Sequence, residues 1–318
     1  MLNFKNTKIV QNLSLLEQKI KYQQSYQEIT ESILSIKKLK PKRFYYIAIF
    51  LFTLGFTLLF ISFIDIHFIV YGLFASIFSL LGVFYYGWLF VAICSKFDDI
   101  SAEIYQKWGL LDLNLHCMPI KNGYVSSVIN DFEELKRGSE PRRITLEHQS
   151  IHEGDERFYF YHNEFVERDL TTKKELYTTC RCGMIFHFPP QFKNIFIISE
   201  GKTPHKLSYQ LASHQFNQQF SLGAQDKHQL AKFLKPSIVE AILNLSNNFV
   251  HLNIEINAKG MICISSDDLD ALNYTADSNI NSPDIFLKEL NQTTIKLPKV
   301  YQFIELYNVL LKYSKDNF

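Results

Sequence analysis

The chain has 318 residues, with 33 lysines and arginines against 32 aspartates and glutamates, and 15% of its residues are aromatic. A nearly neutral chain gives no general reason to expect binding of nucleic acid or of an acidic substrate. The average hides two unlike parts: residues 44–94 consist mainly of Phe, Leu, Ile, Tyr and Val, whereas the remainder is rich in Asn, Gln, Lys, Glu and Ser.

The N-terminal arm from Asn12 to Lys40 contains neither glycine nor proline and carries apolar residues at helical spacing. We expect a long amphipathic helix here, within an N-terminal cytosolic region over residues 1–43. The apolar row slips between Ile20 and Tyr26, which argues against a long regular coiled coil. A short coiled coil, or a helix packed on the cytosolic domain, remains open.

In residues 44–94 the only acidic, basic or histidine side chains are Asp65 and His67, in the stretch ISFIDIHFIV. A bilayer core needs about 20 apolar helical residues to cross it, so residues 44–64 and 68–93 predict two spans. Backbone that leaves a helix needs partners outside the hydrocarbon, which places Asp65 and His67 at the turn of a transmembrane hairpin. The alternative is a buried hairpin of a soluble protein, in which both are satisfied turn residues.

The charges beside the two spans predict their orientation. Basic residues lie before the first span and after the second, while the connection between the spans holds no lysine or arginine. Because basic loops stay on the cytoplasmic side, we expect a multi-pass protein of the bacterial inner (plasma) membrane with both termini in the cytoplasm. The membrane-flanking basic residues before the first span are Lys37, Lys38, Lys40, Lys42 and Arg43. They could hold anionic lipid headgroups, or they could only set the topology.

Small residues punctuate both predicted spans and allow helices to approach closely. They are Gly55 in the first span and Gly72, Ser76, Ser79 and Gly82 in the second. Such residues can serve a pore or the packing of one hairpin on itself. Packing is favoured, because no ionisable residue lies at mid-span, where a conduction path usually needs one.

Residues 95–150 are expected to form a helical connector, in which the second span continues into the cytosol as a helix through Trp108. Glycines and prolines mark irregular connections around a short helical piece over residues 125–135. The one basic loop, residues 135–143, lacks interleaved aromatics, so we interpret it as solvated and do not expect it to bind nucleic acid.

Residues 151–318 predict a cytosolic α+β domain with antiparallel strands and C-terminal helices. Two β-rich runs, residues 156–170 and 174–188, predict a hairpin. The other expected elements are, in chain order, strands over 194–201 and 216–223, helices over 227–234, capped by Asp226, and 236–245, a second hairpin around 257–260, and helices over 282–290 and 299–315. Strands do not alternate with crossover helices, so a doubly wound nucleotide-binding fold is not expected.

No constellation of residues points to catalysis. The chain lacks a phosphate-cradling Gly-Lys-Ser/Thr motif, a Gly-x-Ser-x-Gly elbow and a His-Glu-x-x-His pair. Cys180 and Cys182 share one face of an expected strand, and a zinc site with His187 is conceivable, but buried reduced thiols fit a cytosolic domain better. The acidic string SSDDLDALN lacks the features of a calcium loop, and we interpret it as a solvated loop or helix cap. We therefore expect no catalytic residue, metal or cofactor.

Four stretches carry a resemblance to a known family: GDERFYFYHNEFVERD, TTCRCGMIFHFPPQFKNIFIISEG, FNQQFSLGAQDKHQLAKFLKPSIVEAILNL and HLNIEINAKGMICIS. Together with the order of the parts, they resemble the bacterial domain-of-unknown-function family numbered 3137, whose members have two membrane spans. The resemblance covers nearly the whole chain. The N-terminal arm is longer here, and the Gly-rich stretch usual before the β region is reduced to Gly138 and Gly154. The resemblance implies this architecture and no catalytic residue.

Two kinds of function fit these features. The first is a membrane-anchored cytosolic interaction or sensor protein, whose partners would be the lipid bilayer and a protein partner, a second copy or a small ligand. The second is a membrane-permeabilising effector, for example in bacterial defence, whose cytosolic domain senses a trigger and whose hairpins oligomerise.

Overall fold

The computed structural model describes residues 8–22, 25–36, 42–64, 69–118, 123–151, 157–168, 175–199, 203, 210–268, 270–273 and 277–315. The chain divides into two compact units. Unit 1 comprises residues 1–108 and 274–296, and unit 2 comprises residues 109–273 and 297–318. A segment from the C-terminal part of the chain therefore belongs to the N-terminal unit.

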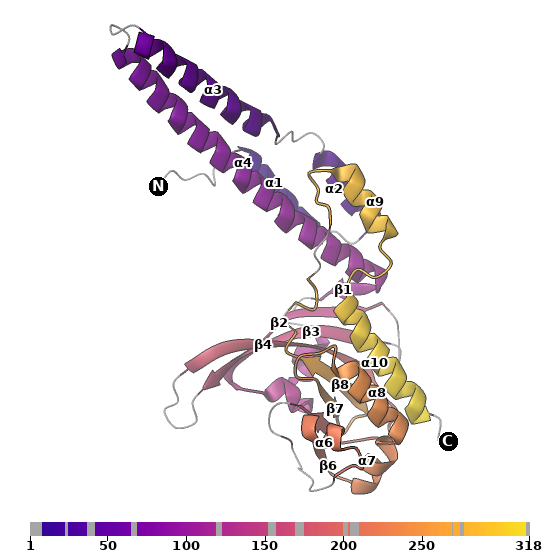
Figure 1. The fold of residues 1–318 in the computed structure, drawn as a ribbon. Coiled ribbons are helices and arrows are strands. Elements are labelled where there is room, and N and C mark those ends of the chain that lie inside the picture. Colours follow the sequence, from indigo (N-terminus) through magenta and orange to yellow (C-terminus); the bar gives the residue numbers. More distant parts are fainter. Residues whose placement is uncertain are drawn as a thin grey trace. The chain divides into compact units, whose positions relative to one another are not determined.

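Unit 1 is helical (Figure 1). Its helices are α1 (Lys8–Tyr22), α2 (Tyr26–Ile36), α3 (Lys42–Ile64), α4 (Ile69–Asp112) and α9 (Pro283–Gln292). The apolar region falls on α3 and on the first half of α4. As expected, α4 continues as one helix through Trp108, so its apolar and polar halves share one rigid axis.

The N-terminal arm forms two helices, and the prediction of one long helix was wrong. The break between α1 and α2 coincides with the slip in the apolar row. Ser25 explains the new start, because its hydroxyl accepts the N–H of Glu28 at 3.3 Å and its carbonyl accepts the N–H of Ile29 at 3.2 Å. A side-chain cap of this kind favours a helix N-terminus at that point.

The second half of α4 lies in a polar-surfaced bundle with α1, α2 and α9. Lys96 of α4 pairs with Glu17 of α1 at 3.1 Å. Tyr105 of α4 packs against Phe286 of α9 with ring centroids 6.4 Å apart. These contacts explain how residues 274–296 come to belong to unit 1.

Unit 2 is α+β and is built on an antiparallel sheet, as expected. Among the described residues the sheet has eight strands in the order β1-β2-β3-β4-β8-β7-β5-β6. The strands are β1 (Leu115–Cys117), β2 (Ser139–Ser150), β3 (Phe158–Arg168), β4 (Glu175–His187), β5 (Ile195–Ile198), β6 (Ser221–Ala224), β7 (Asn253–Ile256) and β8 (Met261–Ser266). The two predicted hairpins are β3–β4 and β7–β8, and β4 pairs with β8 to join them.

The helices of unit 2 are short apart from the last. They are α5 (Tyr124–Ser127), the 3-10 turns η4 (Ile129–Asp131) and η5 (Glu134–Lys136), α6 (His214–Gln219), α7 (Lys227–Phe233), α8 (Pro236–Ser246) and α10 (Pro298–Lys315). Asp226 caps α7 as predicted, since its carboxylate accepts the N–H of His228 at 2.8 Å. Pro236 lies in the first turn of α8, also as predicted.

Three local predictions were wrong. Residues 216–223 are not one strand, because α6 occupies the first half and the hydroxyl of Ser213 caps it at the N–H of Phe216. The helix expected over residues 125–135 is α5 followed by η4 and η5. The expected basic loop over residues 135–143 runs from η5 into β2. This segment has no clear β pattern, and it is extended because it pairs with β3.

The two faces of the sheet are covered by different elements. Helices α7, α8 and α10 cover one face (Figure 1). Buried apolar side chains of β4, β5, β7 and β8 pack against them. On the other face lie residues 123–137, which we call the covering segment. Its Val125 and Leu135 pack with Tyr161 and Ile185 of the sheet in a second, smaller core.

Candidate functional site

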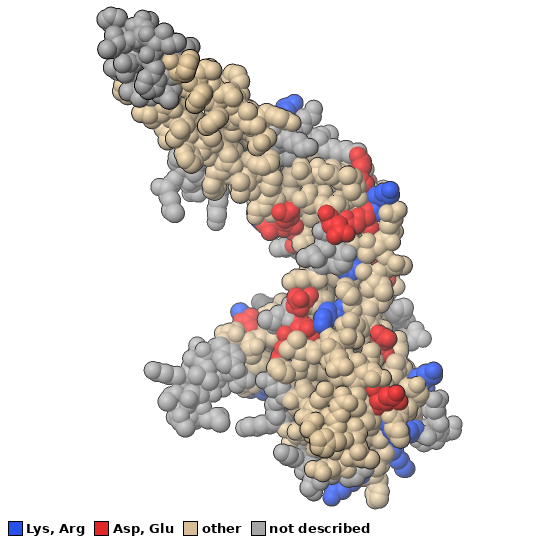
Figure 2. Space-filling view, in the orientation of Figure 1, with Lys and Arg blue, Asp and Glu red and all other residues tan. Residues whose placement is uncertain are grey.

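The apolar helices of unit 1 present their side chains outward. By length and composition, one helix among the described residues, Ser76–Asp112, is apolar enough to cross a membrane, and a shorter apolar stretch, Arg43–Leu58, lies in α3. Only 17% of the most apolar window of the longer helix is buried, whereas a core helix of a soluble protein is mostly buried. Most exposed large apolar side chains of the described residues lie between Tyr45 and Val91. Figure 2 shows the resulting surface, nearly free of charge.

The small residues of this region lie where α3 and α4 meet. A Cβ at Gly55 would lie 2.6 Å from the Cβ of Ser79, and one at Gly82 would lie 2.8 Å from a methyl carbon of Leu51. The hydroxyl of Ser76 donates to the carbonyl of Gly55 at 3.3 Å, and that of Ser79 donates to the carbonyl of Leu51. Close approach and hydroxyl bonds of this kind hold helices together without a hydrophobic driving force.

Several predicted site residues fall outside what the structure describes. They are Asp65, His67, Lys37, Lys38 and Lys40; Lys42 and Gly72 lie in described helices, but their surroundings are not described. Arg43 is exposed in the first turn of α3. The turn and most of the basic flank therefore stay predictions.

A groove of about 910 Å³ opens in unit 2 around the end of β4. Pro189 and Pro190 end the strand, because proline cannot donate a ladder hydrogen bond. The N–H of Phe188 donates to the carbonyl of Gly260 at 2.9 Å, which brings the β7–β8 turn alongside. Gly260 has a φ of +75°, and a Cβ there would lie 3.3 Å from the Cα of Pro190, so this turn requires glycine.

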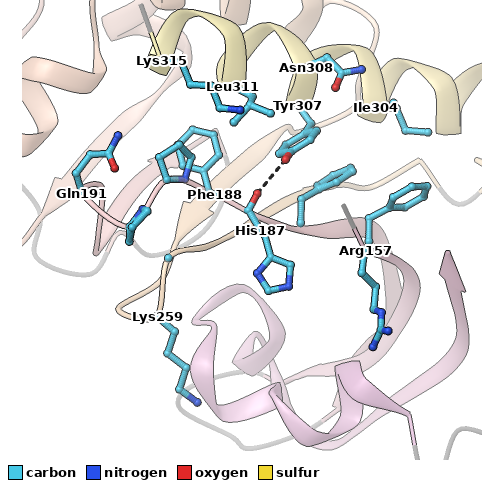
Figure 3. Close-up of a pocket in the computed structure, with 15 residues that line it drawn as sticks. Arg157, His187, Phe188, Gln191, Lys259, Ile304, Tyr307, Asn308, Leu311 and Lys315 are labelled. Carbon is cyan, nitrogen blue, oxygen red and sulfur yellow. Dashed lines mark hydrogen bonds between the residues drawn. The ribbon is translucent and has the colours of Figure 1, made fainter. Parts of the chain in front are cut away.

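One wall of the groove is aromatic. Tyr307 of α10 stacks on Phe186 of β4 with centroids 4.0 Å apart and planes within 4°. Its hydroxyl donates to the carbonyl of His187 at 3.0 Å, so its polar end is satisfied (Figure 3). Phe158 of β3 extends the wall, 5.6 Å from Phe186 between centroids. Packing and a hydrogen bond thus fix the position of α10 against the strand end.

The groove also gathers basic side chains. Arg157, Lys259 and Lys315 come from the start of β3, the β7–β8 turn and the last turn of α10. The lining residues that the structure describes include no carboxylate. In Figure 3 the side chains of Arg157, His187 and Lys259 point to the side of β4 away from α10. Lys259 is 67% exposed and pairs with Asp131 of the covering segment at 2.6 Å.

A buried ion network lies under the covering segment. Arg181 of β4 is 1% exposed, and its Nε lies 2.5 Å from Oε1 of Glu134. The same guanidinium contacts Asp267 and donates to the carbonyl of His251 at 2.7 Å. Asn253 donates to the other oxygen of Glu134 at 2.8 Å. Burial alone lowers the pKa of Arg181, but the carboxylates of Glu134 and Asp267 raise it above its ordinary value, so the charge is retained.

Glu255 of β7 binds the covering segment from the sheet side. Its two carboxyl oxygens accept the N–H groups of Glu133 and Glu134 at 2.9 and 2.8 Å. Burial raises the pKa of Glu255 to about 8, although these two N–H groups act to lower it. Much of the population therefore holds a proton on this carboxyl at neutral pH.

The acidic string SSDDLDALN takes part in this region and is not simply solvated, as we had expected. Asp267 also contacts Nδ1 of His251 at 2.7 Å. Asp268 is buried and pairs with Nζ of Lys299 at 3.0 Å. The one available signal in the sequence was Arg181, a charge inside an otherwise buried strand, which needs a partner.

The five cysteines are all free thiols. Cys182 and Cys263 are buried, and Cys180 is partly buried. Burial raises the pKa of Cys182 to about 12, so this thiol stays protonated at neutral pH. Within the described part of the chain, no group of three or more His, Cys, Asp or Glu side chains is placed to hold a metal ion.

No protein-family model, curated protein or solved structure that we compared with the chain matches it. The resemblance to the domain-of-unknown-function family numbered 3137 therefore stays a prediction from the sequence. Any functional conclusion rests on the geometry of the two units.

Proposed function

We propose that this protein is a membrane-anchored cytosolic interaction or sensor protein. In this proposal α3 and α4 form a two-helix transmembrane hairpin in the bacterial inner membrane, both termini lie in the cytoplasm, and unit 2 is a cytosolic module that binds its ligand in the groove at the end of β4.

The observation that carries the anchor is the outward exposure of the apolar side chains on α3 and α4. Contiguous exposed apolar surface on a soluble protein is rarely larger than a few hundred Å², and larger areas mark membrane or protein contact. The helix lengths suit a bilayer, and Asp, Glu, Lys and Arg are absent from residues 69–94 of α4. The basic residues before α3 support a cytoplasmic N-terminus.

The contacts between α3 and α4 support an anchor more than a pore. Gly55, Ser76, Ser79 and Gly82 are engaged in packing one helix against the other. The hydroxyl of Thr53 on α3 bonds the carbonyl three residues earlier in its own helix at 2.9 Å, so it needs no partner in an oligomer. Among the described residues from 45 to 91, the large side chains that α3 and α4 leave exposed are apolar or aromatic.

Membrane fractionation and reporter fusions test the anchor together. The full chain should remain in the membrane pellet after a carbonate wash and should need detergent for release. A cytoplasmic reporter should be active at either terminus, and a periplasmic reporter should be active only when inserted between residues 64 and 69. Recovery in the soluble fraction, or a periplasmic reporter active at a terminus, would overturn the proposal.

A measurement of the membrane potential in cells that express the protein distinguishes an anchor from a permeabilising effector. On expression of the full chain, an anchor leaves the membrane potential unchanged. Depolarisation that depends on the hairpin, and that is lost when residues 44–94 are replaced by an unrelated two-span hairpin, would instead support the effector.

A further inference from the structure

The exposed apolar surface of α3 and α4 changes character at the end nearer the bundle of α1, α2 and α9. Among the exposed large apolar and aromatic side chains of these two helices that the structure describes, three carry a polar group: Tyr45, Tyr46 and Trp88. We propose that these three rings lie in the phospholipid headgroup and glycerol layer of the cytoplasmic leaflet and thereby set the depth of the hairpin in the bilayer. The inference deepens the proposed anchor and rests on it, since it locates the lipid surface on the two helices.

The chemistry of these side chains suits the boundary between lipid and water. Tyrosine and tryptophan have an apolar ring and one hydrogen-bonding group, so they are enriched where the ring meets lipid and the polar atom reaches water. The exposed rings farther along the hairpin have no such group, and they are Phe50, Phe52, Phe56, Phe60, Phe74, Phe78 and Phe84. In the sequence, residues 47–70 and 72–84 contain neither tyrosine nor tryptophan, and Tyr71 between them lies near the opposite end, at the start of α4. The two kinds of ring are therefore segregated by depth.

Ring contacts between the two helices place the polar rings at one level. Tyr45 packs against Phe90 with ring centroids 5.6 Å apart, and Phe44 packs against Tyr86 with centroids 6.4 Å apart. The first turn of α3 thus lies beside residues 86–90 of α4. The rings of α3 and α4 that carry a polar group are therefore at a similar depth, although they come from separate helices.

The helix lengths put this level one hydrocarbon thickness from the segment that joins the two helices. Residues 45–64 of α3 and 69–88 of α4 each rise by about 29 Å, at about 1.5 Å per residue. The hydrocarbon core of a bilayer is about 30 Å thick. With residues 65–68 at the periplasmic surface, as in the proposed anchor, each helix independently brings its polar rings to the cytoplasmic surface.

The surface of α4 turns polar directly after this level. Val91 is 64% exposed, whereas the exposed side chains over residues 95–99 are those of serine and aspartate. Charged side chains are costly inside the hydrocarbon, so its edge has to cross α4 between these positions. Lys96, which pairs with α1, lies about 12 Å beyond Trp88 along the axis, and a headgroup layer is about 5–8 Å thick. In this placement the bundle of unit 1 begins at the membrane surface without a linker.

The fluorescence of Trp88 measures its depth, because the chain has two tryptophans and the other is buried in the bundle. Trp108 is 6% exposed and packs on Tyr26 with ring centroids 4.9 Å apart. The variant W108F should be reconstituted in phosphatidylcholine vesicles that carry a nitroxide quencher either near the glycerol or near the end of the acyl chain. We expect the shallow quencher to remove most of the fluorescence of Trp88 and the deep quencher to remove much less.

Two matched variants calibrate this measurement. F78W in a W88F/W108F background puts a tryptophan at an exposed position about 15 Å from residue 88 along α4, near the centre of the hydrocarbon, so the deep quencher should dominate there. W88F keeps only Trp108, about 30 Å beyond residue 88 along the same helix, and neither quencher should act on it. Circular dichroism melting of each variant shows whether the fold is intact.

The outcomes separate this inference from the anchor. Stronger quenching of Trp88 by the deep label, or no quenching of Trp88 while F78W is quenched, would overturn the interfacial position of the rings and leave the anchor standing. No quenching at either position, together with release of the protein from the vesicles by a carbonate wash, would overturn both. Stronger quenching by the shallow label at both positions would also overturn both, because the hairpin would then lie along the surface of the bilayer.

Discussion

Strand β7 sends Ile254 and Ile256 to one face of the sheet and Asn253 and Glu255 to the other. Both sets are buried, the isoleucines in the core shared with α7, α8 and α10 and the polar pair beneath the covering segment. An alternating strand ordinarily has one face in water. Here the polar face is buried as well. One side of the strand is therefore stabilised by burial of apolar surface, and the other by hydrogen bonds and ion pairs.

The difference matters because the two forces respond to different conditions. Burial of apolar surface contributes about 25 cal/mol per Å², and it involves no titrating group and no charge that salt can screen. A buried charge is costly unless it is paired, and the pair is sensitive to the loss of either partner. We therefore expect the helix-covered face to supply most of the stability of unit 2. The polar face should determine the position of the covering segment on the sheet and the pH dependence of the stability of unit 2.

The largest effect should come from Arg181→Met. The substitution removes the cation between Glu134 and Asp267 and leaves the buried Glu134 with only the longer ion pair to Arg137, at 3.9 Å. Breaking a buried pair in this way costs about 3–5 kcal/mol. Hydrogen exchange of the detergent-solubilised full chain should show faster exchange in residues 123–137 and in β4.

The matched control for this change is Arg143→Met. Arg143 pairs with Glu164 at 2.8 Å, but its side chain is 68% exposed. An exposed pair contributes about 0–1 kcal/mol, so exchange should barely change. Equal effects of the two substitutions would mean that burial of the network is not what makes it matter.

On the opposite face, Ile254→Ala should cost about 3 kcal/mol, because it leaves a cavity in the core. Ile254 is fully buried among apolar side chains, so the loss should be the same at pH 6 and pH 8 and at low and high salt. Urea unfolding followed by circular dichroism measures it. The exposed Val250→Ala is the control and should change the free energy of unfolding by less than about 0.5 kcal/mol. A loss that depends on pH would contradict the expectation that the apolar face contributes no pH dependence to stability.

A smaller effect should appear as a pH dependence from Glu255. Its pKa is raised from 4.5 to about 8 by burial, so the folded protein keeps a proton that the unfolded chain releases. Unfolding thus releases a proton between these values, and stability falls as pH rises from 7 to 8, with a slope of at most about 1.4 kcal/mol per pH unit. Urea midpoints across this window measure the slope, and Glu255→Gln should flatten it.

The window from pH 7 to 8 is chosen because His162 acts in the opposite direction at lower pH. Burial lowers the pKa of His162 from 6.5 to about 4, so unfolding takes up a proton between those values and stability rises with pH there. Above pH 7 this histidine is neutral in both states. A slope that persists in Glu255→Gln would assign the effect to another group.

How much of the fold can be predicted from the sequence depends on whether local pattern or pairing between distant segments determines each element. The β3–β4 and β7–β8 hairpins, the Asp226 cap and the Pro236 helix start follow from local pattern and turn chemistry, and these predictions were confirmed. Strands β1 and β2 carried no such pattern. Strand β2 is extended because it pairs with β3, and β1 is extended because it pairs with β2. Pairing between distant segments leaves no local signal.

The candidate site was less accessible from the sequence than the fold. Arg157, Lys259 and Lys315 are about 50 to 160 residues apart in the chain, and only the folded domain brings them to the lining of one groove. Asp267 was interpreted as a loop residue, because nothing local identifies Arg181 as its partner. The pattern of apolar residues predicts helices and hairpins, but it does not show which charged residues of distant segments form ion pairs.

The smallest expected effect concerns the rim of the polar face, where Asp131→Asn removes the pair with Lys259. This side chain of the covering segment is 25% exposed and that of Lys259 is 67% exposed, so solvent and salt screen the attraction. The loss should be below about 1 kcal/mol and should vanish at high salt. Hydrogen exchange of residues 123–137 at low and high salt measures it. A loss as large as that of Arg181→Met would mean that the exposed pair, and not the buried network, attaches the covering segment to the sheet.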